Sequence, residues 1–341
     1  MSNSNLGLNR KVIKVLVDSL SDSDSKIYKD IMSITGEPSG EVDENDTLIN
    51  YLTDRTEAIT LTSNAVKKVA DNVFNGYDKL VTVNLPNVTS IGNNAFSNCT
   101  NLTSIDLPNV TSIGYGLFSR CNSLTSIDLP NVKSIGNNAF SSCTSLTSIY
   151  LPNVTSIDEG VFQACTNLTS IDLPNVTSIG GNAFSRCNSL TSIDLSNVTS
   201  IGGNVFSWCT NLTSIDLPNV TSIGSYAFSS CTSLTSIYLP NVTSIGIDAF
   251  SNCTNLTSIY LPNVTSIGSC VFYNCTNLTK IIIGTDISGT CTLESTDAFN
   301  NTPIASGSGY IYVSDDKVDT YKSASNWSIY RAKIKSVNEL S

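Results

Sequence analysis

The stretch LTSIDLPNVTSIGYGLFSRCNS, residues 102–123, is one copy of a 22-residue unit that fills most of the chain. Its first residue, Leu102, recurs at an unbroken interval of 22 from Leu80 to Leu278. Self-similarity at a fixed short period is typical of a solenoid, in which each structural unit stacks on the next. We therefore predict a repeat architecture, although a length of 341 residues would otherwise suit two ordinary domains.

The first half of each unit has the pattern of a strand followed by a turn. Leu102, Ile105 and Leu107 match the spacing that places aliphatic side chains inward and the residues between them in solvent. Pro108 ends the strand because it has no N–H for a sheet ladder, and Asn109 suits the turn. This asparagine recurs in nine units. We expect its side chain to hydrogen-bond the backbone of a neighbouring turn, because stacked turns bury amides that need partners.

The second half of each unit is also apolar on one side. Val110 and Ile113 suit a second short strand on the opposite face, and Phe118 and Cys121 have the spacing of a short helical or 3₁₀ turn. Burial of about eight apolar residues per unit is worth on the order of 10–20 kcal/mol, whereas ordering the backbone costs roughly 1–2 kcal/mol per residue. A single unit is therefore unstable alone, and stability must come from stacking.

The signature LxxIxLPxV..IgxxaFxxC, present over about residues 59–300, resembles the BspA-like leucine-rich repeats of bacteria and their phages. The resemblance implies a repeat solenoid, a right-handed leucine-rich-repeat horseshoe with a parallel β-sheet and short 3₁₀ or helical turns. It also implies a role in adhesion or protein binding. The residues by themselves predict only a stacked array of parallel strands.

The chain is expected to have three parts. Residues 1–58 carry no repeat and are expected to form a small helical N-terminal segment, which serves as an anchor or a cap. Residues 59–302 hold the leucine-rich repeats, and residues 303–341 form a C-terminal cap of strand and helix. Atypical terminal units are expected because an open end of the stack would expose its core.

Both ends give more specific expectations. The N-terminal helices are expected over Val12–Leu20, Ser25–Ile34 and Thr47–Arg55, with a solvated linker at residues 39–46. The C-terminal tail is expected to form a strand over Tyr310–Val313 and then a helix after Ser314. The side chains that should pack on the open end of the stack are Val318, Tyr321, Trp327 and Tyr330. This tail also resembles the ending of leucine-rich-repeat proteins from Gram-positive gut bacteria and their prophages, with Ser314 in place of the usual proline.

One strand position varies while its neighbours do not, and it should form an exposed stripe on the sheet face. Its occupants are Asn84, Asp106, Asp128, Tyr150, Asp172, Asp194, Asp216, Tyr238, Tyr260 and Ile282, of which the eight Asp and Tyr residues are the candidate binding residues. Exposed tyrosine beside carboxylates suits a protein or sugar surface. A face kept polar only for solubility is the alternative. A calcium site is disfavoured because no loop completes the oxygen shell of the ion.

Composition argues against several functions. The net charge of −10 disfavours nucleic acid and anionic membranes as partners, and no run of about 18 apolar residues predicts membrane insertion. The chain has no histidine and no C-x-x-C pair, so we predict neither an enzyme nor a metal or other cofactor. Nine of the eleven cysteines recur at the interval of 22, from Cys99 to Cys275, and we expect buried free thiols.

The leading hypothesis is a virion-associated protein of a phage or prophage. Its repeats would present a surface to a protein or surface glycan of a bacterial host, and residues 1–58 would join it to a larger virion assembly. The N-terminal stretch has no secretory signal, which favours assembly inside the cell. The alternatives are a bacterial cell-surface adhesin, a cytoplasmic scaffold for protein interactions, and a spacer.

Overall fold

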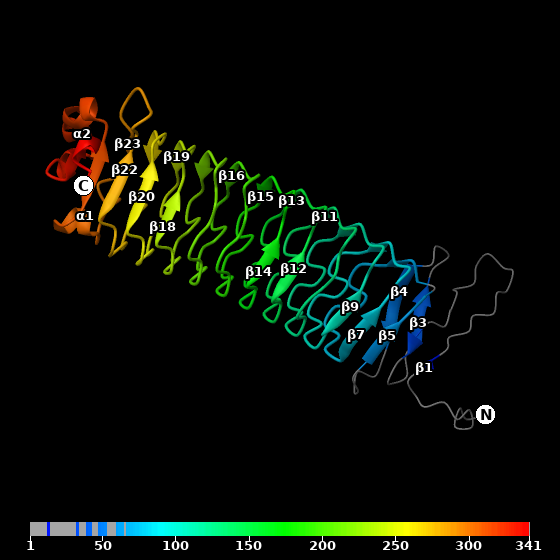
Figure 1. The fold of residues 1–341 in the computed structure, drawn as a ribbon. Helices are drawn as coiled ribbons and strands as arrows, with labels where there is room; N and C mark the ends of the chain where they lie inside the picture. The colour runs from blue at the N-terminus through cyan, green and yellow to red at the C-terminus, as the bar shows by residue number, and fades with distance from the viewer. Residues whose placement is uncertain are drawn as a thin grey trace, which may run out of the picture. The chain divides into compact units, whose positions relative to one another are not determined.

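The structure, a computed structural model, describes the backbone of residues 12–13, 32–33, 39–42, 47–52, 59–64 and 66–340 (Figure 1). Side chains are described for residues 60–64 and 66–340. The chain divides into two compact units, residues 1–154 and residues 155–341. Each unit is built from the 22-residue repeat.

Short strands dominate both units. The strands of the first unit are β1 (Val12–Ile13), β2 (Met32–Ser33), β3 (Ser39–Val42), β4 (Thr47–Leu52), β5 (Ile59–Thr62), β6 (Lys68–Val69), β7 (Leu80–Asn84), β8 (Ser90–Ile91), β9 (Ser104–Asp106), β10 (Ser112–Ile113), β11 (Ser134–Ile135) and β12 (Ser148–Tyr150). The repeat strands of the second unit are β13 (Ser156–Ile157), β14 (Ser170–Asp172), β15 (Ser178–Ile179), β16 (Ser200–Ile201), β17 (Ser222–Ile223), β18 (Ser236–Tyr238), β19 (Ser244–Ile245), β20 (Ser258–Leu261), β21 (Ser266–Ile267), β22 (Lys280–Ile283) and β23 (Thr292–Leu293). The chain then ends with α1 (Pro303–Ser306), β24 (Tyr310–Val313), η2 (Asp315–Lys317), α2 (Val318–Ser323), η3 (Ser328–Tyr330), β25 (Ile334–Ser336) and η4 (Val337–Glu339).

The repeats build two parallel sheets. The strand in the first half of each repeat contributes to what we call the first sheet, and the strand in the second half contributes to the second sheet. In the second unit, the first sheet includes the order β18-β20-β22-β24-β25, and the second sheet has the order β13-β15-β16-β17-β19-β21-β23. All of these pairings are parallel, and an inward residue such as Ile223 pairs with Ile245, its equivalent one repeat away. The first unit follows the same plan, with β5-β7-β9 in the first sheet and β4-β6-β8 in the second. The predicted array of stacked parallel strands is thus confirmed.

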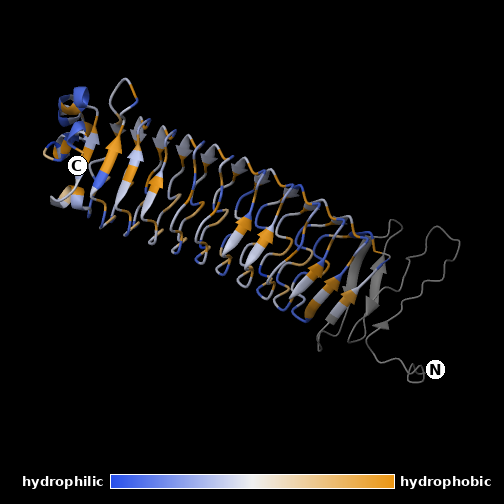
Figure 2. Ribbon diagram, in the orientation of Figure 1, coloured by the Kyte–Doolittle hydropathy of each residue, from blue (hydrophilic) through white to orange (hydrophobic). Residues whose placement is uncertain are grey.

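A column of phenylalanine rings runs through the core of each unit. Phe74, Phe96 and Phe118 stack with ring centroids 5.0 and 5.8 Å apart in the first unit. The rings from Phe162 to Phe299 do the same in the second unit, at 5.2–5.8 Å. Figure 2 shows hydrophobic residues interleaved with polar ones along the strands that enclose this core. Because one ring contacts the next, neighbouring repeats stabilise each other.

The asparagine at the end of each first-sheet strand ties neighbouring repeats together. The Nδ2 of Asn109 donates to the carbonyl oxygen of Pro86 at 2.7 Å, and the Nδ2 of Asn241 donates to that of Pro218 at 2.7 Å. The same bond recurs in other repeats of both units. The prediction that this side chain satisfies the backbone of a neighbouring turn is confirmed.

The segment between the phenylalanine and the cysteine of each repeat is a single turn rather than the expected helical or 3₁₀ turn. The N–H of Cys121 donates to the carbonyl oxygen of Phe118 at 3.1 Å, but Arg120 between them has a φ of 60°. A left-handed residue cannot continue a right-handed helix. The segment therefore turns the chain into the next strand without adding a helix.

The helix predicted over Thr47–Arg55 is wrong, because Thr47–Leu52 forms β4. This strand pairs antiparallel with β3, which occupies part of the expected linker, and parallel with β6 of the first repeat. The isoleucine, threonine and tyrosine of β4 favour a strand, and β6 offers it a partner edge. Strands β1 and β2 overlap the two other predicted helices, whose remaining residues lie outside the described ones.

The C-terminal cap closes the second unit largely as predicted. Strand β24 has the expected bounds and α2 follows Ser314 after one short 3₁₀ turn. The side chains of Tyr321, Trp327 and Tyr330 are buried, whereas Val318 is only half-buried. The final strand β25, which pairs with β24, was not predicted. Among the described residues, no helix has both the length and the hydrophobicity needed to cross a membrane.

Replacing Gly224 with alanine is expected to lower the free energy of unfolding by about 1–3 kcal/mol. A Cβ at this position would lie 2.6 Å from the carbonyl carbon of Gly202 and 2.7 Å from the nitrogen of Gly203, both backbone atoms of the preceding repeat. Gly289→Ala in the same unit is the matched control, because nothing lies within 4 Å of its added carbon. Urea denaturation of the two variants measures the difference, and equal stabilities would contradict the close approach of adjacent turns.

Candidate functional site

The predicted stripe of the first unit lies on the outer face of the first sheet. Asp106, Asp128 and Tyr150 are exposed, and each pairs in parallel with the next. Tyr150 is 53 % exposed. Asn84 is half-buried. The expected exposure of the three candidate residues is therefore present, and their role in binding stays a prediction.

The second unit presents the acidic part of the stripe. Asp172, Asp194 and Asp216 are exposed, and Asp194 pairs in parallel with Asp216. One carboxylate is held by its own turn, because the backbone N–H of Ser196 donates to Oδ1 of Asp194 at 2.9 Å. Ser196 stands where the neighbouring repeats have proline, which has no N–H to donate. Among the described residues, no group of three or more acidic or cysteine side chains is placed to hold a metal ion.

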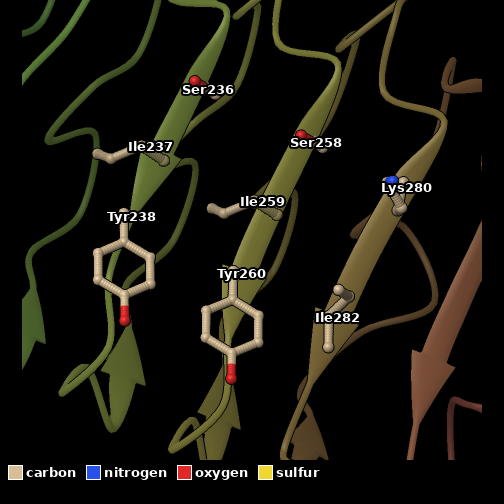
Figure 3. Close-up of a pocket in the computed structure, with 8 residues that line it drawn as sticks. All are labelled: Ser236, Ile237, Tyr238, Ser258, Ile259, Tyr260, Lys280 and Ile282. Atoms are coloured by element: carbon tan, nitrogen blue, oxygen red, sulfur yellow. The ribbon is translucent and has the colours of Figure 1, made fainter. Parts of the chain in front are cut away.

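Next to the aspartates, Tyr238 and Tyr260 form an aromatic pair on β18 and β20. Their ring centroids are 5.8 Å apart and their planes differ by 1°. Tyr238 is 57 % exposed, and Tyr260 is half-buried. Figure 3 shows the two rings side by side, each with a face turned outward and with both hydroxyls pointing the same way. The strand register explains this order, since Tyr238 and Tyr260 are direct partners in the sheet.

A shallow groove of about 400 Å³ surrounds this pair. Its lining residues are Ser236, Ile237, Tyr238, Ser258, Ile259, Tyr260, Lys280 and Ile282 (Figure 3). The serines and Lys280 lie two residues before the tyrosines and Ile282 along their strands, so the two rows share one face of the sheet. The groove therefore combines flat aromatic surface with hydroxyl and ammonium donors.

The nine repeated cysteines from Cys99 to Cys275 form a cysteine ladder, which lies inside the stack and away from the stripe. The thiol of Cys121 donates to the carbonyl oxygen of Phe96 at 3.1 Å, and that of Cys209 donates to the carbonyl oxygen of Phe184 at 3.1 Å. Burial raises the pKa of the Cys209 thiol to about 12, although its backbone contact at Cys187 acts in the opposite direction. The thiols are free and buried, as the sequence predicts. Their hydrogen bonds give these thiols a structural role. Because they stay protonated, they are poor nucleophiles.

Sequence reasoning missed several exposed side chains. Lys280 was overlooked although it replaces the serine found at this position in the repeats from Ser104 to Ser258. Trp208 and Tyr226 were also missed. They are 52 % and 43 % exposed on turns, at positions with φ values of 64° and 59°. Comparing all 22 positions between repeats, rather than one strand position, would have found all three.

Solved structures of leucine-rich repeat proteins are similar to this chain. A leucine-rich repeat protein from Bacteroides ovatus is 22 % identical, with 89 % of this chain and 98 % of that chain covered and a TM-score of 0.42. A leucine rich cell surface protein from Faecalibacterium prausnitzii is 25 % identical, with coverages of 91 % and 98 % and a TM-score of 0.45. The pneumococcal vaccine antigen PcpA is 14 % identical, with coverages of 89 % and 97 % and a TM-score of 0.49. No curated protein matches the chain at a significant level.

The repeat itself has a matching family model. The model of the BspA type leucine rich repeat region matches residues 51–154, 133–246 and 199–308. These overlapping matches include every strand of the stripe described above, from β7 to β22. The chain therefore belongs to the BspA-type leucine-rich repeat family.

Proposed function

We propose that this protein is a non-catalytic binding protein of the bacterial cell surface and that the stripe on its first sheet contacts the partner. The observation that supports this best is the exposure of two tyrosine rings at the stripe position, Tyr150 on β12 at 53 % and Tyr238 on β18 at 57 %. A large ring held on a sheet offers contact area at low cost in conformational entropy. The surrounding backbone is already ordered by stacking, so binding does not have to order it.

The absence of catalysis in this proposal follows from the side chains available. The sequence contains no histidine, so general base catalysis would fall to other residues. Six thiols of the ladder, including Cys187 and Cys231, are buried with raised pKa values, because burial disfavours the thiolate. Leucine-rich repeats are typically binding scaffolds, which agrees with this proposal.

The cell surface replaces the phage particle as the proposed location. The resemblance of the repeat implies adhesion, and the similar protein from Faecalibacterium prausnitzii is a leucine rich cell surface protein. Antibody labelling of intact cells of the source bacterium tests this location. Labelling of intact cells is expected, whereas signal confined to purified phage particles would restore the virion hypothesis.

Replacing Tyr150 with alanine is expected to weaken partner binding at least about tenfold, as for an aromatic residue at the centre of an interface. Biolayer interferometry of the full chain against a panel of immobilised proteins and polysaccharides, and against intact bacterial cells, measures this change. Tyr115→Ala is the matched control, because Tyr115 is 51 % exposed but lies on a turn outside the stripe. The proposal fails if both variants bind every captured partner as the unaltered chain does.

A further inference from the structure

We propose that β18, β20 and β22 carry a site for a linear, β-linked acidic polysaccharide, with sugar rings on Tyr238 and Tyr260 and a sugar carboxylate at Lys280. This inference rests on the proposed function, because it names the ligand class for one part of the same stripe. Its basis is the groove of about 400 Å³ that these residues line.

The tyrosine pair has the geometry of a platform for sugar rings. The two planes differ by 1° and the centroids lie 5.8 Å apart, so the rings present parallel faces one repeat apart. Figure 3 shows these faces turned outward from neighbouring strands. The face of an aromatic ring is electron-rich, and the axial C–H groups of a pyranose are weakly positive, so the two pack together. The ring spacing is close to the length of one sugar in an extended β-linked chain.

The row beside the tyrosines supplies hydrogen-bond donors for the edges of such sugars. Ser236 and Ser258 occupy the same groove and carry hydroxyls that donate and accept. Both side chains have access to solvent. A pyranose has an apolar face and a rim of hydroxyls. A row of tyrosine rings beside a row of serine hydroxyls can therefore contact both parts of the same sugar.

Lys280 gives the site a preference for a sugar acid. It is exposed, and its ammonium has no ion-pair or hydrogen-bond partner among the described residues. The equivalent position is serine in each repeat from Ser104 to Ser258, so a positive charge occurs at this position only beside the tyrosine pair. A carboxylate on the ligand is the complementary group for an unpaired ammonium.

Asp216 limits where the acidic sugars can lie. It is exposed and pairs in parallel with Tyr238, on the side of the platform away from Lys280. A sugar acid over Tyr238 would meet this carboxylate at short range and be repelled. The site therefore suits a chain in which acidic and neutral sugars alternate, with a neutral sugar on Tyr238 and an acidic one toward Lys280.

A folded protein fits this groove less well than a sugar chain does. Aromatic residues that anchor protein interfaces are usually enclosed by neighbours that exclude water when the partner docks. The tyrosine pair is instead bordered by Ser236, Ser258 and Lys280 on one side and by Asp216 on another. These polar groups would stay partly unpaired under an apolar protein surface, at a cost to affinity.

Isothermal titration of the full chain with two probes tests the inference. The acidic probe is a hyaluronan octasaccharide, in which glucuronate alternates with a neutral amino sugar, and the neutral probe is a β-linked N-acetylglucosamine hexasaccharide. We expect the acidic probe to bind at least tenfold more tightly than the neutral one. Lys280→Ser, which restores the serine of the other repeats, should abolish this preference, so that the two probes bind with similar affinity.

The tyrosine variants separate a sugar platform from other roles. Tyr238→Ala is expected to weaken both probes at least tenfold, whereas Tyr260→Phe, which keeps the ring, should retain most of the binding. Tyr226→Ala is the control, because this exposed tyrosine lies on a turn outside the groove. Circular dichroism of each variant checks that the fold is intact.

The inference is overturned if the unaltered chain binds neither probe saturably, or if Tyr238→Ala and Tyr226→Ala behave alike. The proposed function can survive that result. If immobilised proteins are still captured and Tyr150→Ala or Tyr238→Ala releases them, the stripe binds a protein and only the saccharide assignment falls. If no partner is captured through the stripe, the proposed function falls as well.

Discussion

Raising the pH from 8 to 12 is expected to unfold the protein, because the cysteine ladder must lose its protons. Burial raises the pKa of the Cys143 and Cys209 thiols from 9.0 to about 12. Burial also raises the pKa of Cys121, Cys187 and Cys231. Each of these thiols donates a hydrogen bond to the phenylalanine carbonyl of the preceding repeat, 25 residues earlier in the chain, at 3.0–3.1 Å. A thiolate could not make that bond, and burial would strand its charge.

The direction of this pH dependence follows from proton binding. Above about pH 9 the unfolded chain releases thiol protons that the folded chain retains, so the folded state binds more protons and the free energy of unfolding falls as pH rises. The contribution is fully present below the unfolded pKa and is lost as pH approaches about 12. Each thiol contributes on the order of 1 kcal/mol per pH unit in this window. Several together exceed the total stability of a typical domain, which is about 5–15 kcal/mol.

Circular dichroism during a slow alkaline titration measures the transition, and a thiol reagent added at each pH reports access to the cysteines. Both signals are expected to change together, since the thiols become reactive only on unfolding. The double variant Cys187→Ser/Cys231→Ser is the control, because serine hydroxyls do not titrate in this range and should give a shallower pH dependence. Rapid modification of the ladder at pH 8, with the circular dichroism unchanged, would show that these thiols are accessible in the folded protein.

Replacing Trp327 with alanine is expected to lower the free energy of unfolding by about 3–5 kcal/mol, the cost of removing a large buried side chain. Trp327 is 1 % exposed, and the centroid of its ring lies 5.3 Å from the ring centroid of Tyr321 and 6.1 Å from that of Phe299. Its Nε1 donates to the carbonyl oxygen of Cys291 at 2.7 Å, so the variant also leaves a buried acceptor unpaired. The variant removes one contact of the cap with Phe299, the last phenylalanine of the column, and the Tyr330 ring stays 5.2 Å from Phe299 between centroids.

The other tryptophan of the chain is the matched control for this variant. Trp208 is 52 % exposed, and Trp208→Ala is expected to change stability by only about 0.5 kcal/mol. Urea denaturation gives the two free energies, and hydrogen exchange should show lost protection in α2 and β25 for Trp327→Ala alone. Similar losses in the two variants would mean that the cap contributes little to the stability of the second unit.

The sequence predicts the repeat interior well because one rule applies at every copy. A register of 22 residues stacks equivalent positions, so inward residues such as Ile223 and Ile245 must pair and the intervening ones must face solvent. Beyond the repeat this redundancy is lost. Thr47–Leu52 lacks a second copy for comparison, and its strand depends on pairing with β6, a tertiary contact that local periodicity does not reveal.

The candidate site was predictable only in part. The exposure of Tyr150 and Tyr238 follows from strand alternation alone. The groove around Tyr260 also depends on Lys280 and Ser258, which occupy a different position of the repeat. The left-handed backbone at Trp208 could not be foreseen, because bulky residues seldom adopt it and the turn imposes it in every copy.

The constant offset of the bonds between repeats has a consequence for how such genes evolve. Thr103 bonds the backbone 22 residues earlier, Asn109 reaches back 23 residues and Cys121 reaches back 25. An unequal crossover that inserts or deletes one whole copy recreates every donor and acceptor at the same offset. A gain or loss of any other length changes the offset of each bond that spans it. Recombination can therefore lengthen or shorten the protein in whole copies, and selection can then alter the exposed residues of each copy independently.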